Sequence, residues 1–249
     1  MTTRPFVLAA LCGLLLLPAT AFAKVRVAAS TNDLASIAAS VGGDEVEVFS
    51  IARPNADVHR VEVLPSYMVK VARAQLYLKV GLGLDRWADA VIDGSRNDRV
   101  LVVDCSQGIE PLEKPTGTLS AAMGDVHPNG NPHYWLDPRN GAIVARNVAV
   151  ALGRVDPPNA ALYRQRAEAF AGEAEAAWVR GRKLAGGLTS RTLLTYHSSW
   201  VYLAHAFDLE VAGTVEPKPG IPPTAKHLAA LVATAKSRQV PVLLQEPYF

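Results

Sequence analysis

The amino-acid sequence predicts an α/β protein of two lobes, each with a mostly parallel sheet, joined by a long connecting helix. Three observations lead to this prediction. Short runs of Val, Ile and Leu alternate with helical patterns up to about Gly153, the same alternation resumes at Thr192, and a long Ala-rich helical stretch lies between them. Alternating strands and helices are typical of βαβ units with parallel sheets.

The first lobe is expected over residues 24–155. Its strand candidates have apolar residues at consecutive positions, as strands buried on both faces do. They are Val25–Ala29, Val46–Ile51, Leu76–Val80 and Val100–Asp104. Helical patterns lie between them, around Asp33–Val41, Pro65–Ala74 and Asp85–Ile92. Another helix is predicted from Asp137-Pro138 to Gly153, because Asp caps helices well and Pro suits the first helical position.

The connecting helix is expected over residues 156–187. Asp156-Pro157 starts it in the same way as the preceding helix. Its apolar or small residues follow one another at alternating spacings of four and three, as one face of a helix requires. They are Tyr163, Ala167, Phe170, Ala174, Ala177, Gly181 and Leu184. Because the other faces are charged, the stretch is interpreted as a strut between two lobes.

The second lobe is expected over residues 188–249. Its predicted elements repeat the strand–helix alternation of the first lobe. They are strand Thr192–Tyr196, helix Ser199–Phe207, strand Glu210–Thr214, helix Thr224–Lys236 and strand Val240–Gln245.

The first residues predict export. Arg4 precedes an apolar stretch from Phe6 to Leu17, and Ala21-Phe22-Ala23 supplies the small residues that signal peptidase recognises. Residues 1–23 are therefore interpreted as a signal peptide, cleaved near Ala23, for a periplasmic protein. A membrane anchor is the alternative, but the apolar stretch is shorter than the roughly 20 residues that span a bilayer. Lipidation at Cys12 is rejected, because Leu11 is poorly suited to that cleavage.

Charge and cysteine content restrict the function. The chain has 25 basic and 23 acidic residues, a net charge of +2, which argues against a nucleic-acid-binding surface. After signal cleavage Cys105 is the only cysteine left, so no disulfide within the mature chain is expected. The sequence predicts a near-neutral, soluble, exported protein, expected to be a monomer.

Three of the six histidines lie where a binding site is expected. His59 follows a predicted strand in a polar segment, His133 directly precedes a capped helix, and His197 follows another strand immediately. Ligands bind outside the carboxyl ends of parallel strands, and imidazole is a common zinc ligand. A single histidine in a loop is more often a surface or capping residue. The pattern alone therefore predicts two α/β lobes with a candidate metal site.

The residues around these histidines resemble one family throughout the mature chain. Residues 131–138 (NPHYWLDP) resemble the metal-site motif of the zinc and manganese substrate-binding proteins of ABC importers, which have a rigid helix between their lobes. Residues 54–59 (PNADVH) resemble the family's first ligand loop, and residues 81–87 (GLGLDRW) the segment after it. Residues 196–202 (YHSSWVY) resemble the third ligand turn, and Glu216 to Phe249 the stretch up to a Glu-Pro motif.

The resemblance implies that His59, His133 and His197 bind the metal in a cleft between the lobes. The zinc branch has histidine at the third position where the manganese branch usually has a carboxylate, so His197 favours Zn²⁺. A binding protein of this kind is not an enzyme. It delivers its metal to an ABC-type membrane permease, and a zinc-donating chaperone is a further partner to consider.

The chain departs from the family pattern in three places. The first ligand loop reads Asp57-Val58-His59 where the family has Asp-Pro-His. The histidine-rich loop of many zinc members is reduced to Ala121–Asn131, where His127 alone is a candidate metal-recruiting residue in a loop expected to be mobile. The family also continues past the position of Phe249 to a final Asp ligand, so the C-terminal lobe is expected to be incomplete. Glu216 and Glu246 are candidates to orient a ligand or, for Glu246, to supply the fourth one.

Alternatives remain open at this point. Three histidines with an open water position also match a catalytic zinc site, so an exported zinc-dependent hydrolase is one alternative. No Glu or Asp lies in a recognisable general-base motif beside a ligand, which argues against it. A manganese- or iron-binding member of the same family, or an adhesin with the same fold, are the others.

Overall fold

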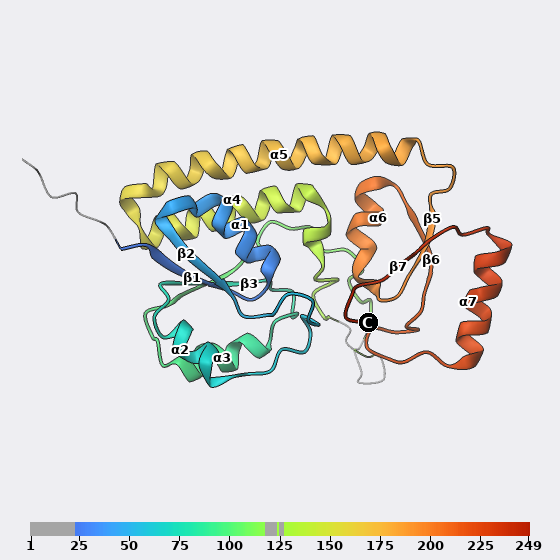
Figure 1. Ribbon diagram of the computed structural model, residues 1–249, viewed down its shortest axis with the longest axis horizontal. Coiled ribbons are helices and arrows are strands. Elements are labelled where there is room, and N and C mark those ends of the chain that lie inside the picture. The colour runs from blue at the N-terminus through green and yellow to red at the C-terminus, as the bar shows by residue number, and fades with distance from the viewer. Residues whose placement is uncertain (1–22, 118–123, 125–126) are drawn as a thin grey trace, which may run out of the picture.

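The computed structural model describes residues 23–117, 124 and 127–249 and shows two parallel sheets bridged by a long helix (Figure 1). The predicted α/β class is confirmed. The predicted signal peptide up to Phe22 lies outside the described residues. So do Ala121–Met123 and residues 125–126 of the predicted recruiting loop. Within the described part, no helix is both long and apolar enough to cross a membrane.

The N-terminal sheet has four parallel strands in the order β2-β1-β3-β4. Their bounds are β1 Val25–Ala29, β2 Val46–Ser50, β3 Leu76–Lys79 and β4 Leu101–Asp104. All four predicted strands are confirmed to within one residue at either end. Because the strands are parallel, the loops after β2 and β3 leave the sheet at the same edge.

Helices cover both faces of this sheet (Figure 1). One face carries α1 (Asn32–Gly42) and α4 (Pro138–Val155), and the other carries α2 (Pro65–Val71) and α3 (Trp87–Ser95). Neighbouring residues of β1 therefore enter different cores, Val27 the one under α1 and α4 and Ala28 the one under α2 and α3. Burial on both faces is the reason why the strands have consecutive apolar residues.

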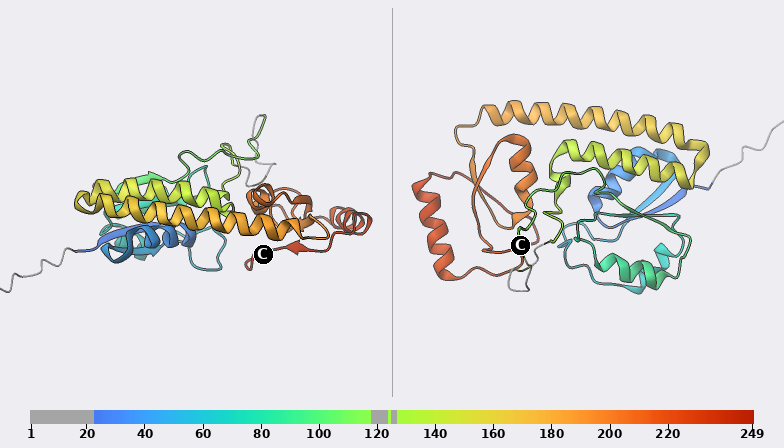
Figure 2. Two further views of the ribbon diagram at one scale, coloured as in Figure 1. Left: turned by 90° about the horizontal axis from the view of Figure 1, so that it is seen from above. Right: turned by 180° about the vertical axis from the view of Figure 1, so that it is seen from behind.

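The long helix α5 (Ala160–Gly186) follows a short 3₁₀ turn and runs back along α4 (Figures 1 and 2). Its 27 residues span about 40 Å at 1.5 Å per residue. Tyr163, Ala167 and Ala174 are buried in its first half. The second half extends past α4 towards α6, and Leu184 is 75% exposed. The predicted apolar stripe is therefore buried only where the helix has neighbours.

The C-terminal sheet has three parallel strands in the order β6-β5-β7. Its elements are β5 Thr192–Thr195, α6 Val201–Phe207, β6 Glu210–Thr214, α7 Ala225–Ser237 and β7 Leu243–Leu244. Strand β7 is shorter than the predicted Val240–Gln245. Pro241 has no N–H to donate to a neighbouring strand, so regular pairing begins only after it.

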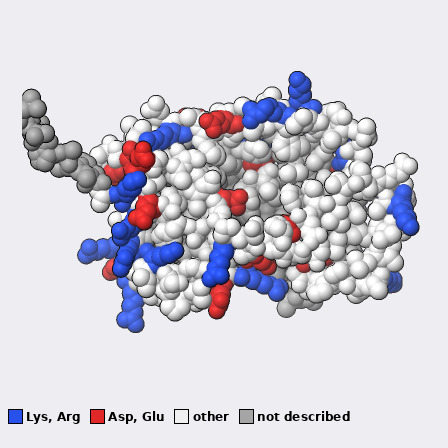
Figure 3. Space-filling view, in the orientation of Figure 1, with Lys and Arg blue, Asp and Glu red and all other residues white. Residues whose placement is uncertain are grey.

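Basic and acidic side chains are mixed on the visible face of the N-terminal half (Figure 3). Several of them form exposed ion pairs, such as Arg26 with Glu47 and Arg146 with Glu168. Such pairs contribute little to stability, on the order of 0–1 kcal/mol each. The stability of the fold therefore comes mainly from the apolar cores.

Candidate metal centre

Three segments far apart in the sequence bring histidines to one point between the two sheets. His59 lies in the irregular segment between β2 and α2. His133 precedes the 3₁₀ turn Tyr134–Leu136, which leads into α4, and His197 follows β5 and precedes the turn Ser198–Trp200. Each sits at the start of a helical turn or after a strand end, where the polypeptide changes direction and side chains converge.

The ring nitrogens of the three histidines face one another. One donor atom from each lies within 4.8 Å of the other two. Nε2 of His59 and Nε2 of His133 are 3.1 Å apart, and the ring centroids of His133 and His197 are 5.5 Å apart. Ligand nitrogens of a tetrahedral zinc ion lie about 3.3 Å from one another, given Zn–N distances of about 2.0–2.1 Å. Small side-chain movements would bring all three within range of one ion.

Hydrogen bonds orient two of the three rings. Nδ1 of His133 is 2.9 Å from Oδ1 of Asn131, and Nδ1 of His197 is 2.7 Å from Oε2 of Glu216. Because an amide oxygen and a carboxylate can only accept, both Nδ1 atoms carry the proton and leave Nε2 with a free lone pair. Partners of this kind are common around metal-binding histidines.

The site is dry, and this keeps the imidazoles neutral. His133 is 3% and His197 2% exposed, while His59 is half-buried. Burial, followed by the neighbouring histidines, lowers the pKa of His59 to about 3 and that of His133 well below 6.5. The neutral form of imidazole is the form that binds metals.

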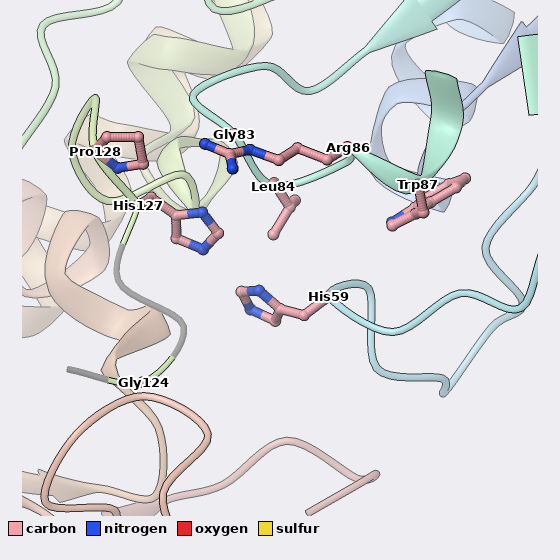
Figure 4. A pocket seen from close by; sticks show the side chains of 8 residues that line it. All are labelled: His59, Gly83, Leu84, Arg86, Trp87, Gly124, His127 and Pro128. Carbon is pink, nitrogen blue, oxygen red and sulfur yellow. The ribbon is translucent and has the colours of Figure 1, made fainter. Parts of the chain in front are cut away.

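His127 lies next to this cluster but outside the group of converging donor atoms. Its ring stacks on that of His59, with centroids 5.3 Å apart. The two histidines face each other across a cavity of about 320 Å³, and Arg86 lies along the same wall (Figure 4). His127 is therefore at the mouth of the site, as a residue that recruits metal would need to be.

The two candidate glutamates have different surroundings. Glu216 is buried and accepts hydrogen bonds from Nδ1 of His197 and from the backbone N–H of Gly220 at 3.0 Å. Glu246 is also buried and accepts a hydrogen bond from the Ser199 hydroxyl. Its second oxygen has no hydrogen-bond partner within the described part of the chain. Neither carboxylate belongs to the group of converging donor atoms formed by the three histidines.

Asn131 is a residue to which the sequence reasoning assigned no role. Its side-chain oxygen accepts from both the backbone N–H and Nδ1 of His133, and its amide donates to the carbonyl of Ser198 at 2.8 Å. Tyr202 on α6 donates to the Asn131 carbonyl at 2.7 Å. Asn131 stands two residues before His133, and this spacing, which suits an Asx-type turn, was the only signal in the sequence.

A second cavity, of about 280 Å³, borders the other side of the cluster. Its lining includes Asp57, His59, His197 and Phe249. The Phe249 ring stacks on that of His197, with centroids 5.3 Å apart. His59 thus borders cavities on both sides, whereas His133 lines neither of them.

Comparisons with known proteins agree with this geometry. The family described as zinc-uptake complex component A, periplasmic (ZnuA), matches residues 27–249. The iron-binding protein YfeA of Yersinia pestis is 28% identical over 234 residues, spanning 92% of this chain and 71% of the relative. The zinc uptake protein ZnuA of Brucella abortus is 30% identical over 120 residues, or 47% of this chain and 35% of the relative. A crystal structure of ZnuA superimposes with a TM-score of 0.81 at 26% identity, covering 91% of this chain and 84% of that one.

Proposed function

We propose that this protein carries Zn²⁺, starting from the fact that the chain belongs to the zinc-uptake complex component A family. Members of this family are metal-binding substrate-binding proteins of ABC importers, which are not enzymes. They are exported, either to the periplasm or as lipoproteins, and they act with a membrane permease and an ATPase. Relatives are named for iron, manganese or zinc, so the metal has to be argued from the site of this chain.

The convergence of three imidazole nitrogens is the observation that supports zinc. His59, His133 and His197 would bind the ion through nitrogen atoms, and no carboxylate belongs to the converging donor group among the described residues. Nitrogen donors suit zinc, while manganese prefers carboxylate, carbonyl and water oxygens. A three-histidine site therefore favours Zn²⁺ over Mn²⁺.

Three neutral imidazoles leave the +2 charge of zinc uncompensated. A fourth ligand is needed for a tetrahedral shell, and we propose water or a carboxylate, with Glu246 as the candidate within this chain. Glu216 would act through His197, because its carboxylate accepts the Nδ1 proton and so makes Nε2 a better donor.

The proposed cycle involves no chemical reaction. After export and removal of the signal peptide, the protein would take up Zn²⁺ between its N-terminal lobe (24–155) and C-terminal lobe (188–249). It would then deliver the ion to an ABC-type permease. A zinc-donating chaperone is one source of the ion. A hydrolase would need a general base beside the metal, but Glu216 is engaged by His197 and Gly220, and Glu246 by Ser199.

Metal competition tests this proposal. Purified protein offered equal Zn²⁺ and Mn²⁺ is expected to retain one Zn²⁺ per chain in native mass spectrometry. His133→Ala should lose most of the zinc affinity, because a small open shell has no substitute ligand. His205→Ala, which changes an exposed histidine on α6, is the matched control and should bind as the parent does. Retention of Mn²⁺ in preference to zinc would contradict the proposal.

A further inference from the structure

The three histidines of the site are held unequally. His133 and His197 each donate Nδ1–H to a fixed acceptor, but Nδ1 of His59 is buried and has no hydrogen-bond partner within the described part of the chain. A ring with such a bond loses it on turning, at a net cost of about 0.5–1.5 kcal/mol. The His59 ring has no side-chain hydrogen bond of this kind to lose.

Asn131 is itself fixed by both halves of the molecule. Its amide group donates to Glu113 at 3.0 Å and to the carbonyl of Ser198, the residue next to His197. Tyr202 fixes its backbone, since the hydroxyl donates to the Asn131 carbonyl and accepts from the backbone N–H of Leu112. The acceptor for His133 is therefore rigid, and the same side chain ties His133 to the His197 turn.

Glu216 holds His197 with comparable firmness. The carboxylate is 7% exposed and its Oε2 also accepts from the backbone N–H of Gly220. The backbone on either side of the Glu216 side chain is thereby drawn around the His197 ring. Two rings with fixed acceptors, joined through the Asn131–Ser198 bond, make one preorganised half of the site.

The segment that carries His59 is held loosely by comparison. It has no regular secondary structure between β2 and α2. A bond from the Trp87 indole N–H to the Val58 carbonyl, 3.0 Å long, ties it to α3, and the His59 backbone N–H donates within the segment, to Asp57. The two cavities on either side of His59 leave room for the ring to move.

We propose that His133 and His197 form a fixed two-histidine platform, positioned by Asn131 and Glu216, and that His59 is the exchangeable ligand through which the ion enters and leaves. This inference rests on the proposed zinc-binding function of the same site. In the metal-free protein the platform keeps its geometry while the His59 ring samples other orientations. Zinc release begins with the departure of His59 and leaves the lobes in place.

The first experiment needs no metal. Long-range ¹H–¹⁵N spectra of the imidazole nitrogens of metal-free protein, at about pH 7.5 where free histidine is neutral, report the tautomer of each ring. We expect a single Nδ1–H tautomer for His133 and His197 and an exchanging mixture for His59. A single tautomer at His59, or mixtures at the other two, would overturn the inference.

The second experiment measures zinc release to a chelator. Trp87→Phe removes the indole bond to the Val58 carbonyl but keeps an aromatic ring, and it should speed release by about threefold to tenfold, as loss of one hydrogen bond predicts. Asn131→Ala should weaken zinc affinity by about 10- to 100-fold and change the visible spectrum of bound Co²⁺. Asn131→Asp, which restores the acceptor for His133, should recover the parent spectrum.

Asn147→Ala is the matched control, because this amide also donates to two backbone carbonyls, those of Cys105 and Gln107, away from the site. It should leave release rate and Co²⁺ spectrum unchanged. If Asn131→Ala matches it, or if Trp87→Phe releases zinc as slowly as the parent, the inference is wrong while zinc binding stands. If no variant or parent binds zinc, the proposed function itself fails.

Discussion

At the residue scale, the decisive property of the site is that buried imidazoles stay neutral. Burial and the neighbouring histidines lower the pKa of His59 to about 3 and that of His133 well below 6.5. In the unfolded chain both would titrate near 6.5. Above that pH both states are neutral and the shift has no effect on stability. As the pH falls from 6.5 towards 3, the unfolded chain binds protons that the folded chain does not, and stability is lost.

The metal-free protein should therefore be less stable at mildly acidic pH. At about pH 5 the shift of His59 alone lowers the free energy of unfolding by about 2 kcal/mol. Thermal melts of metal-free protein at about pH 7.5 and pH 5 should show this loss. His59→Gln should reduce the difference, and His205→Gln, at an exposed position, should keep it. Equal pH dependence in all three proteins would contradict the assignment.

His127 is expected to act on the rate of zinc loading. It stacks on His59 at the mouth of the cavity but does not belong to the converging donor group. His127→Ala should leave the equilibrium zinc affinity nearly unchanged while slowing transfer from a zinc–chelator complex, because an intermediate ligand at the entrance is lost. Stopped-flow measurement of loading tests this, with His205→Ala as control. Equal loading rates for His127→Ala and the parent would show that His127 is an incidental loop residue.

At the element scale, α5 illustrates how small residues allow close packing between helices. A Cβ atom added at Gly181 would lie 2.2 Å from the Phe207 ring of α6, whereas one added at Gly172 would meet no atom within 4 Å. Both glycines lie in the interior of the same helix. Glycine in a helix interior is less stable than Ala by about 0.5–1 kcal/mol, because it loses more backbone freedom on folding.

The two glycines therefore predict opposite effects of the same substitution. Gly172→Ala should stabilise the protein by about 0.5–1 kcal/mol. Gly181→Ala should destabilise it by about 1–3 kcal/mol, because the methyl group would displace the Phe207 ring. Urea denaturation of both variants measures this directly. Stabilisation by Gly181→Ala would show that α5 and α6 pack less closely than described.

At the scale of the whole molecule, the site joins the two halves of the chain. His59 and His133 come from the N-terminal half and His197 from the C-terminal half. The halves are also connected by α5 and by the hydrogen bonds of Asn131 and Tyr202. An ion bound by all three histidines adds a further connection without requiring the halves to move far.

Zinc should thus stabilise the protein without changing its overall size. A ligand present at about 100 times its dissociation constant raises the free energy of unfolding by about 2.7 kcal/mol. The melting temperature should rise on zinc addition, and the radius of gyration from X-ray scattering should stay the same. His197→Ala should lose most of the stabilisation. A marked contraction on zinc binding would instead indicate hinge closure between the halves.

Local patterns determined much of this protein by themselves. Runs of apolar residues in Val25–Ala29 or Leu76–Lys79 predict buried parallel strands, because burial on both faces leaves no alternation. Asp137-Pro138 predicts the start of α4, and the Asp137 side chain does accept from the backbone N–H of Arg139 there. The three histidines could be chosen because residues flanking each of them resemble one family. All of these signals lie within a few neighbouring residues.

Only the tertiary structure decided which partners meet across long sequence separations. His133 and Asn131 are neighbours in sequence, but the bonds that fix Asn131 come from Ser198 and Tyr202, more than sixty residues away. The sequence offered Glu216 and Glu246 as equivalent candidates, and the fold placed Glu216 against His197 and Glu246 against Ser199. No local pattern encodes these contacts, because they depend on how two sheets and a 27-residue helix set the distance between the halves.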